Sequence, residues 1–580
     1  MAREVETAPT KKPTPAPQAQ AVSGSEAVVL SLLHEGVETV FGYPGGAIMP
    51  VYDALFEYEQ RIRHILVRHE QGAVHAAEGY ARASGKTGVC IATSGPGATN
   101  LVTGIADARM DSTPIVCITG QVPSRMLGSD AFQETDIMSV SAPLTKWSCQ
   151  ITRPEEIPSV ISKAFYLARS GRPGPVLVDI TKDAQIGTLS YSPATVREVP
   201  GYRPVPELDA ARVREAARLI NESTRPMVLV GQGVLLSRAQ EELRALIEKA
   251  GLPFACTLLG LPALPRRHPL HVGMLGMHGN YGPNVRTNDC DLLVAVGMRF
   301  DDRVTGDVSQ YARQARIIHI EIDPSEIDKN VKADVGINAD AREALAALAA
   351  EVRPASHEGW LAGFRECDRT EYDRVIARDI HPDAPGLRMA EVIHQLSERS
   401  RGEAIIVTDV GQHQMAAARY YRFSEGSNMI TSGGLGTMGF ALPAALGAGI
   451  ACPDRQVVAV IGDGGFQMTI QELGTILQSG APVKMMILNN EYLGMVRQWQ
   501  QLFFSRRYSA TELTNPDFVS IAMAYNIEAR RITSREELGD AIDAMLRAES
   551  SYLLEVAVER EDNIFPMIPS GAAVSEIRLE

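Results

Sequence analysis

Residues 462–490, GDGGFQMTIQELGTILQSGAPVKMMILNN, connect the ends of two short apolar runs. The runs QVVAVI and VKMMIL are bounded by Gly, Pro and Asn, a pattern typical of buried strands in a parallel sheet. The segment between them, TIQELGTILQSG, has apolar residues at helical spacing and closes on a glycine. The stretch therefore predicts a β-α-β unit.

Asp463 and Asn490 each stand where one of these strands ends, 27 positions apart. Ligands of open α/β sheets bind at the carboxyl ends of the strands, so both side chains are expected at one crevice. Carboxylate and amide oxygens suit Mg²⁺, which fills its remaining positions with waters and phosphates. A lone GDG is usually an ordinary turn, but the NN pair at this distance favours a metal site.

The GDG and NN pair resembles the fingerprint of thiamine diphosphate-dependent enzymes. The resemblance implies that Asp463, Asn490 and the main-chain carbonyl of Tyr492 hold Mg²⁺ against the diphosphate. Gly464 and Gly465 would let the backbone approach a phosphate closely.

Composition limits the possibilities further. With 580 residues, 45% of them hydrophobic, the chain is long enough for several domains with large cores. The net charge of -14 and the lack of a basic run argue against a nucleic-acid partner. Seven scattered cysteines without a CxxC pair favour a reducing, cytoplasmic setting. The longest apolar stretch is too short to span a membrane and contains Pro443.

The chain divides into a tail and three α/β segments. Residues 1–21, rich in Pro, Ala, Thr and Lys, are expected to be a disordered tail. Strand-like runs with Gly-rich turns then recur over 22–195, 207–355 and 388–580, with a polar helical linker at 356–387. The predicted fold is α/β, with three successive doubly wound parallel-sheet domains. The resemblance makes these a pyrimidine-binding domain, a central FAD-binding domain, and a diphosphate- and Mg-binding domain with a C-terminal tail.

Thiamine chemistry also needs a carboxyl group that shares a proton with the coenzyme's pyrimidine ring. Glu70, in VRHEQGAVHAAEGYAR, follows an apolar run and precedes helical alanine spacing. Taken alone, a glutamate there is more simply a helix-terminal charge that complements the helix dipole. The family's matching RHEQGA segment implies the catalytic role instead.

Further segments resemble the catalytic subunit of acetohydroxyacid synthase, among them TSGPGATN at 93–100, RFDDRVTG at 299–306 and GMVRQWQ at 494–500. This resemblance implies that Gln121 and Gln133 lie near the reacting centre. It implies that Met438 bends the coenzyme, although a methionine beside glycines is ordinarily a flexible core filler.

The same resemblance implies that the second 2-keto acid is received by Arg303 at its carboxylate and by Trp499 at its alkyl group. A surface ion pair of Arg303 with Asp301 or Asp302 is the simpler alternative. Cofactor contacts are also implied. Gln412, His413 and Gly436 would serve thiamine diphosphate, and Pro123 and Ser570 would line the channel above the site. FAD would be held by Arg172, Gly231, Gly233, Thr257, Leu258, Gly276, Met277, His278, Gly297, Arg299, Asp301, Asp323 and Asp340.

The implied reaction decarboxylates pyruvate and joins the two-carbon unit to a second pyruvate or to 2-oxobutyrate, in branched-chain amino acid biosynthesis. Glu70 would serve the coenzyme of a partner chain, so a homodimer, or a dimer of dimers, is expected. A separate small regulatory subunit is a further expected partner. The alternatives are a flavin-dependent pyruvate oxidase, another thiamine diphosphate carboligase, an empty central domain, and a catalytically silent paralogue.

Overall fold

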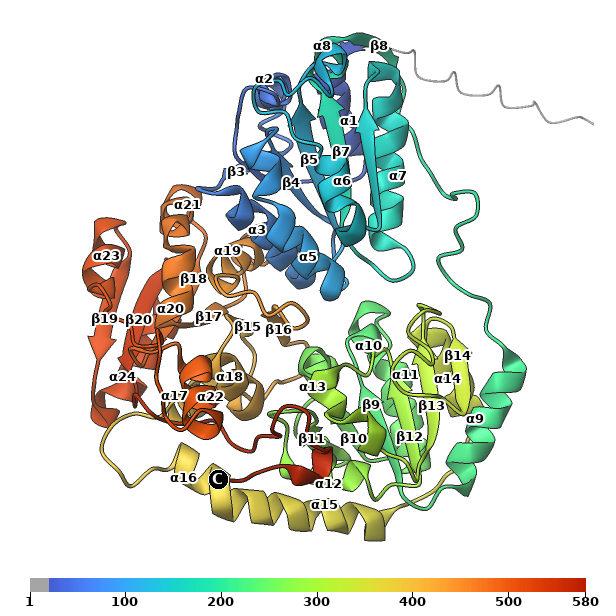
Figure 1. Ribbon diagram of the computed structural model, residues 1–580, viewed down its shortest axis with the longest axis vertical. Coiled ribbons are helices and arrows are strands. Elements are labelled where there is room, and N and C mark those ends of the chain that lie inside the picture. The colour runs from blue at the N-terminus through green and yellow to red at the C-terminus, as the bar shows by residue number, and fades with distance from the viewer. Residues whose placement is uncertain (1–19) are drawn as a thin grey trace, which may run out of the picture.

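The computed structural model describes residues 20–580. The predicted tail lies outside this range except for its last two residues, which form half of strand β1 (Gln20–Ser23). β1 pairs antiparallel with β8 (Thr188–Tyr191). The chain forms three six-stranded parallel sheets, each with its own helices (Figure 1). The prediction of three α/β domains is therefore confirmed.

The first domain holds the sheet β3-β2-β4-β5-β7-β6. Its order reverses between the neighbouring strands β2 and β4, as in a doubly wound sheet. β6 was not predicted from the sequence, because WSCQI is largely polar; in the structure this strand is only partly buried. The strands are β2 (Thr39–Gly42), β3 (Arg63–Leu66), β4 (Gly88–Ala92), β5 (Ile115–Gln121), β6 (Trp147–Ile151) and β7 (Val176–Thr181). The helices are α1 (Gly24–His34), α2 (Met49–Glu57), α3 (Glu70–Ser84), α4 (Pro96–Thr99), α5 (Val102–Met110), α6 (Ile137–Ser141), α7 (Ile157–Arg169) and α8 (Lys182–Ile186).

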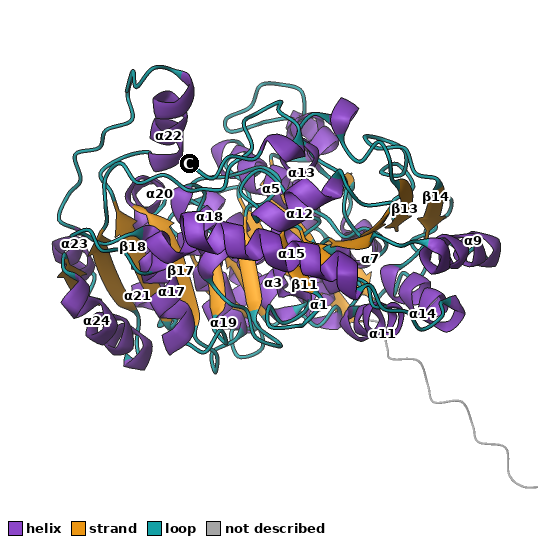
Figure 2. Cartoon of the chain, turned by 90° about the horizontal axis from the view of Figure 1, so that it is seen from below, coloured by secondary structure: helices purple, strands orange, loops and turns teal. Residues whose placement is uncertain are grey.

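The middle domain holds the sheet β11-β10-β9-β12-β13-β14, which reverses between β9 and β12. Its strands are β9 (Pro226–Val230), β10 (Phe254–Cys256), β11 (His271–Met274), β12 (Leu292–Val296), β13 (Arg316–Glu321) and β14 (Val335–Asn338). Its helices are α9 (Ala210–Glu222), α10 (Gly233–Leu236), α11 (Gln240–Ala250), α12 (Tyr281–Thr287), α13 (Asp302–Thr305) and α14 (Ala341–Glu351). The linker after it is helical, with α15 (Glu358–Glu371) and α16 (Ala377–Ile380). α15 crosses the lower face of the molecule (Figure 2).

The third domain holds the sheet β16-β15-β17-β18-β20-β19. Its strands are β15 (Ile405–Thr408), β16 (Asn428–Thr431), β17 (Val457–Gly462), β18 (Val483–Asn489), β19 (Glu528–Ile532) and β20 (Tyr552–Ala557). Its helices are α17 (Met389–Arg399), α18 (Gln412–Tyr420), α19 (Ala441–Ala451), α20 (Asp463–Met468), α21 (Leu473–Ser479), α22 (Gly494–Phe503), α23 (Phe518–Ala524) and α24 (Arg535–Arg547).

The β-α-β unit predicted at 462–490 is confirmed with one difference. The connection is not a single helix, because α20 begins directly at Asp463 and a 3-10 turn, Ile470–Glu472, precedes α21. α21 ends at Gly480 with φ 68°, a left-handed conformation that favours glycine.

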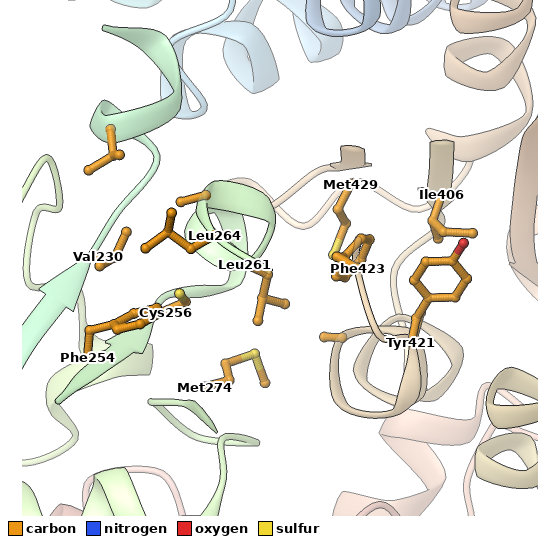
Figure 3. Close-up of a cluster of buried hydrophobic side chains, with 14 of the residues drawn as sticks. Val230, Phe254, Cys256, Leu261, Leu264, Met274, Ile406, Tyr421, Phe423 and Met429 are labelled. Atoms are coloured by element: carbon orange, nitrogen blue, oxygen red, sulfur yellow. The ribbon is translucent and has the colours of Figure 1, made fainter. Parts of the chain in front are cut away.

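Close packing of helices and of apolar side chains joins the third domain to the other two. α3 of the first domain packs on α19 of the third, where a Cβ on Gly79 would lie 1.9 Å from the Ala444 carbonyl oxygen and one on Gly447 would lie 1.9 Å from that of Ala76. Only glycine permits this helix approach. The middle and third domains share an apolar cluster that includes Leu261, Phe423 and Met429 (Figure 3). Within residues 20–580, no helix combines the length and apolarity that a membrane crossing requires.

Candidate active site

The structure places Asp463 and Asn490 at the same sheet edge. β17 and β18 are neighbouring parallel strands, with Gly462 paired to Leu488. Asp463 follows β17 as the first residue of α20, and Asn490 follows β18. Both are buried, at 1% and 3% exposure. The main-chain N–H of Tyr492 donates to Asn490 Oδ1 at 3.2 Å, which holds Tyr492 next to the Asn490 side chain.

Asp463 has an amide neighbour that the sequence did not reveal. Asn515 Nδ2 donates to Asp463 Oδ2 at 2.7 Å and to Asn489 Oδ1 at 3.0 Å. Burial raises the pKa of Asp463 to about 6, because the low-dielectric surroundings disfavour its charge. A divalent cation beside this carboxylate would offset that cost. The donor set of hard oxygens therefore fits Mg²⁺.

The start of α18 lies beside this cluster. Its N-cap, Gly411, has φ 149°, and a Cβ on Gly462 would lie 2.8 Å from His413 Nδ1. His413 Nε2 is buried and has no hydrogen-bond partner within residues 20–580. Burial lowers the pKa of His413 to about 3, so the ring is neutral. An orphaned ring nitrogen in a glycine-lined helix start fits a diphosphate group.

The side-chain N–H groups of Gln412, which were expected to donate to the diphosphate, donate to other residues of the protein. Its Nε2 donates to Gln498 Oε1 and to the Asp562 carbonyl oxygen, both at 2.8 Å. Its Oε1 accepts from Asn490 Nδ2 at 3.4 Å. Both side-chain hydrogens are thus used within the protein, and Gln412 orients the Asn490 amide instead.

A cavity of about 870 Å³ lies where the three domains meet. It opens at the switch point between β9 and β12, the usual ligand position of a doubly wound sheet. The cavity is lined by most residues that the sequence predicted for FAD and for the acceptor: Arg172, Gly233, Thr257, Leu258, Gly276, Met277, His278, Gly297, Arg299, Asp301, Arg303, Asp340 and Trp499. Gly436 and Met438, which were predicted to serve thiamine diphosphate, line it as well.

Two predicted FAD residues do not line this cavity. A Cβ on Gly231 would lie 2.1 Å from the Gly297 carbonyl oxygen, so this glycine serves the close approach of two backbones. Asp323 pairs with Arg172 at 3.3 Å and acts on the cavity through that cation. Glu321, at the end of β13, lines the cavity but was not predicted, and burial raises its pKa to about 7.

The lining suits a dinucleotide. Guanidinium groups of Arg172 and Arg299 can bind phosphates, and the carboxylates of Glu321 and Asp340 can accept from ribose hydroxyls. Asp340 is also the N-cap of α14, accepting from the Arg342 N–H at 2.9 Å.

Arg303 and Trp499 enter this cavity from two different domains. The alternative of a surface ion pair for Arg303 is present in the structure, with Asp302 as its partner. Asp301 caps α13 and lies 3.6 Å from Arg299, while Asp302 is 3.8 Å from Arg303 NH1. The Arg303–Asp302 pair is long and both side chains are exposed, so it contributes little, and the guanidinium can exchange Asp302 for the carboxylate of a ligand.

Met438 lies between the cavity and the metal-site turn. A Cβ on Gly464 would lie 3.8 Å from Met438 Cε, and one on Gly465 would lie 2.4 Å from Asp409 Oδ1. Gly436, two residues before Met438, has φ 73°. The segment thus turns sharply beneath the cavity.

Glu70, Gln121 and Gln133 gather at the edge of the first sheet. Glu70 begins α3, is 9% exposed and accepts from Asn100 Nδ2 at 2.9 Å. A Cβ on Gly97 would lie 3.2 Å from Glu70 Oε1, and one on Gly95 would lie 2.8 Å from the Gln133 carbonyl oxygen. Gln121 Nε2 donates to the Thr135 carbonyl oxygen at 2.9 Å.

Within one chain this group is separate from the cavity, which none of its three residues lines. The helices α3 and α19 form a layer between the first and third sheets. Pro123 and Ser570 also lie outside the lining of the cavity. Pro123 caps a short 3-10 helix of the first domain. Ser570 is exposed on the C-terminal segment, which contacts the middle domain through the Gly306–Ala573 bridge.

Models of a known protein family match residues in each of the three domains. Three family models match the chain: the N-terminal TPP binding domain of thiamine pyrophosphate enzymes at 22–140, their central domain at 213–348 and their C-terminal TPP binding domain at 409–556.

Relatives that match over nearly the whole chain identify the group within this family. The large subunit of acetolactate synthase isozyme 2 from Escherichia coli is 46% identical over 559 residues, 96% of this chain and 99% of its own. The acetolactate synthase large subunit of Parasynechococcus marenigrum is 47% identical, over 96% of this chain and 91% of its own. That of Corynebacterium glutamicum is 45% identical, over 98% and 94%. The chain belongs to the acetolactate synthase large subunits, within the thiamine pyrophosphate enzyme family.

Proposed function

We propose that this chain decarboxylates pyruvate and transfers the two-carbon unit to a second pyruvate or to 2-oxobutyrate, yielding 2-acetolactate or 2-aceto-2-hydroxybutyrate. Bound thiamine diphosphate supplies the electron sink for decarboxylation. The observation that carries the proposal is the meeting of Arg303, Trp499 and Met438 in one cavity, next to the turn that bears Asp463.

The residues of the chain divide the work. Asp463, Asn490 and the Tyr492 carbonyl would hold Mg²⁺, and His413 would contact the diphosphate. Glu70 would hold the proton that it shares with the pyrimidine nitrogen of the coenzyme. Arg303 binds the carboxylate of the second keto acid, and Trp499 supplies an apolar wall for its alkyl group.

A homodimer or a dimer of dimers is part of the proposal, because Glu70 does not line the cavity of its own chain. Glu70, Gln121 and Gln133 then complete the site of the partner. Pro123 and Ser570 would flank the same entrance from the two subunits. The relatives are named large subunits, and a separate small regulatory subunit is part of the proposal.

FAD is proposed for the cavity, because its position, Arg172, Arg299 and the carboxylates suit a dinucleotide. It would have a structural role without net redox work. A cytoplasmic location is also proposed, and all seven cysteines are free thiols.

The proposal is tested on purified protein by its flavin absorption spectrum and by acetolactate formation from pyruvate with thiamine diphosphate and Mg²⁺. Bound flavin together with acetolactate and without oxygen consumption is expected. Acetate formation coupled to oxygen consumption would support a pyruvate oxidase instead, and an absence of CO₂ release would support a silent paralogue.

A further inference from the structure

One carboxylate of the third domain lies against the helix start that bears Glu70. Glu472 ends the 3-10 turn after α20, and its side chain is fully buried at 0% exposure. Both of its carboxylate oxygens accept from the main-chain N–H of Arg68 at 3.2 Å. Thr475 Oγ1 donates to Glu472 Oε2 at 2.6 Å and fixes its orientation.

Gly72 shows how close this approach is. It lies in the first turn of α3, and a Cβ on it would be 2.4 Å from Glu472 Oε1. Any larger residue would displace the carboxylate. The contact therefore explains the glycine two residues after Glu70 in the segment RHEQGA.

The Arg68 side chain makes a second connection to the same part of the third domain. Its NH2 donates to the Gly474 carbonyl oxygen at 3.1 Å and to Gln478 Oε1 at 2.8 Å, both on α21. Its NH1 donates to the Leu66 carbonyl oxygen at 2.9 Å. Arg68 and Gly72 thus flank Glu70, and each is in contact with residues 472–478.

We infer that Glu472, with Arg68, is a positioning residue that sets the location of the Glu70 carboxyl group. The inference rests on the proposed function, since it concerns the coenzyme-activating role of Glu70. Within residues 20–580, no hydrogen bond or ion pair joins the Glu472 side chain to that of Glu70. It acts by fixing the backbone at both sides of Glu70.

The test compares Glu472→Gln with Glu70→Gln and a matched control, Arg63→Ala. Arg63 NH2 donates to the Ser479 carbonyl oxygen at 2.6 Å across the same interface, but on an exposed side chain away from the start of α3. Each variant is assayed for coenzyme affinity by fluorescence titration and for exchange of the coenzyme C2 proton in deuterium oxide. Amide hydrogen exchange of the segment 66–74 is measured on the coenzyme-free protein.

Glu472→Gln is expected to bind the coenzyme normally, to expose amides 68–72 to faster exchange, and to slow C2 exchange by at least about tenfold, as a misplaced catalytic group does. Arg63→Ala is expected to change none of these. If Glu472→Gln does not fold, Thr475→Val serves in its place, because it keeps the carboxylate but removes the hydroxyl that orients it.

The outcomes separate the two claims. Wild-type C2 exchange in a folded Glu472→Gln or Thr475→Val protein, with slow exchange in Glu70→Gln, would overturn the positioning role and leave the proposed function intact. Equal slowing in Arg63→Ala would also overturn it, because any loosening of the interface would then suffice. Wild-type exchange in Glu70→Gln would remove the activating role of Glu70 itself.

Discussion

Trp499 gives the sharpest test of acceptor choice. It lies on α22, lines the cavity with Met495 and Val496, and packs against the cluster that contains Phe565 and Met567. Its position is therefore fixed by packing. If the indole contacts the acceptor's alkyl group, Trp499→Leu removes a contact that 2-oxobutyrate uses more than pyruvate does.

The two acceptors differ by one methylene group, which is worth roughly 1 to 3 kcal/mol in an apolar pocket. The preference for 2-oxobutyrate should accordingly fall by at least about tenfold in Trp499→Leu. Pyruvate decarboxylation should change much less, because it precedes acceptor entry. Arg303→Ala should instead impair both acceptors, since both carry the carboxylate.

The assay is a competition at fixed concentrations of pyruvate and 2-oxobutyrate, with both products measured. Phe503→Leu is the matched control, because it truncates an aromatic residue on the same helix that is 41% exposed and outside the cavity lining. An unchanged product ratio in Trp499→Leu would remove the indole from the acceptor pocket. An equal shift in Phe503→Leu would assign the effect to the helix as a whole.

Three further perturbations address the metal, the proton relay and the core. Asp463→Ala should keep the fold but weaken Mg²⁺-dependent coenzyme binding by more than about tenfold, since a ligand oxygen is lost; normal half-saturation by thiamine diphosphate would refute the assignment. Glu70→Gln should retain coenzyme in a binding titration yet slow C2 proton exchange, because an amide cannot share the proton. Burial raises the pKa of Asp179 from 3.8 to about 6, so the native state binds the extra proton and loses stability as pH rises through that value. In the wild type, the free energy of unfolding should fall by about 1.4 kcal/mol between about pH 5 and about pH 8 because of this group. Denaturant unfolding of Asp179→Asn should lack that fall.

The sequence was most informative where local pattern and chemistry coincide. The apolar runs before Asp463 and Asn490 predicted neighbouring strands, and β17 and β18 pair in parallel. Short strands such as β10 and β11 were not predicted, since three or four residues carry too little periodicity. Three successive α/β segments resemble the domains of one family in the same order, and this resemblance was enough to predict the three domains.

Contacts between residues far apart in the chain could not be predicted from the sequence. Asn515 reaches Asp463 from a loop 52 positions later, and Glu472 meets Arg68 across 404 positions. Neither residue stands in a pattern that points to its partner. The hydrogen bonds of Gln412 likewise depend on where α22 and the Asp562 segment pack. Tertiary placement, not local preference, determines these roles.

The central claim is that the two-carbon unit from pyruvate is transferred to a second keto acid. It is tested most directly by measuring CO₂, acetolactate and acetate together, with purified protein, pyruvate, thiamine diphosphate and Mg²⁺. Because two pyruvate molecules yield one acetolactate and one CO₂, equal amounts of these two products are predicted, with no acetate and no oxygen uptake. CO₂ accompanied by acetate or acetaldehyde in place of acetolactate would contradict the proposed function.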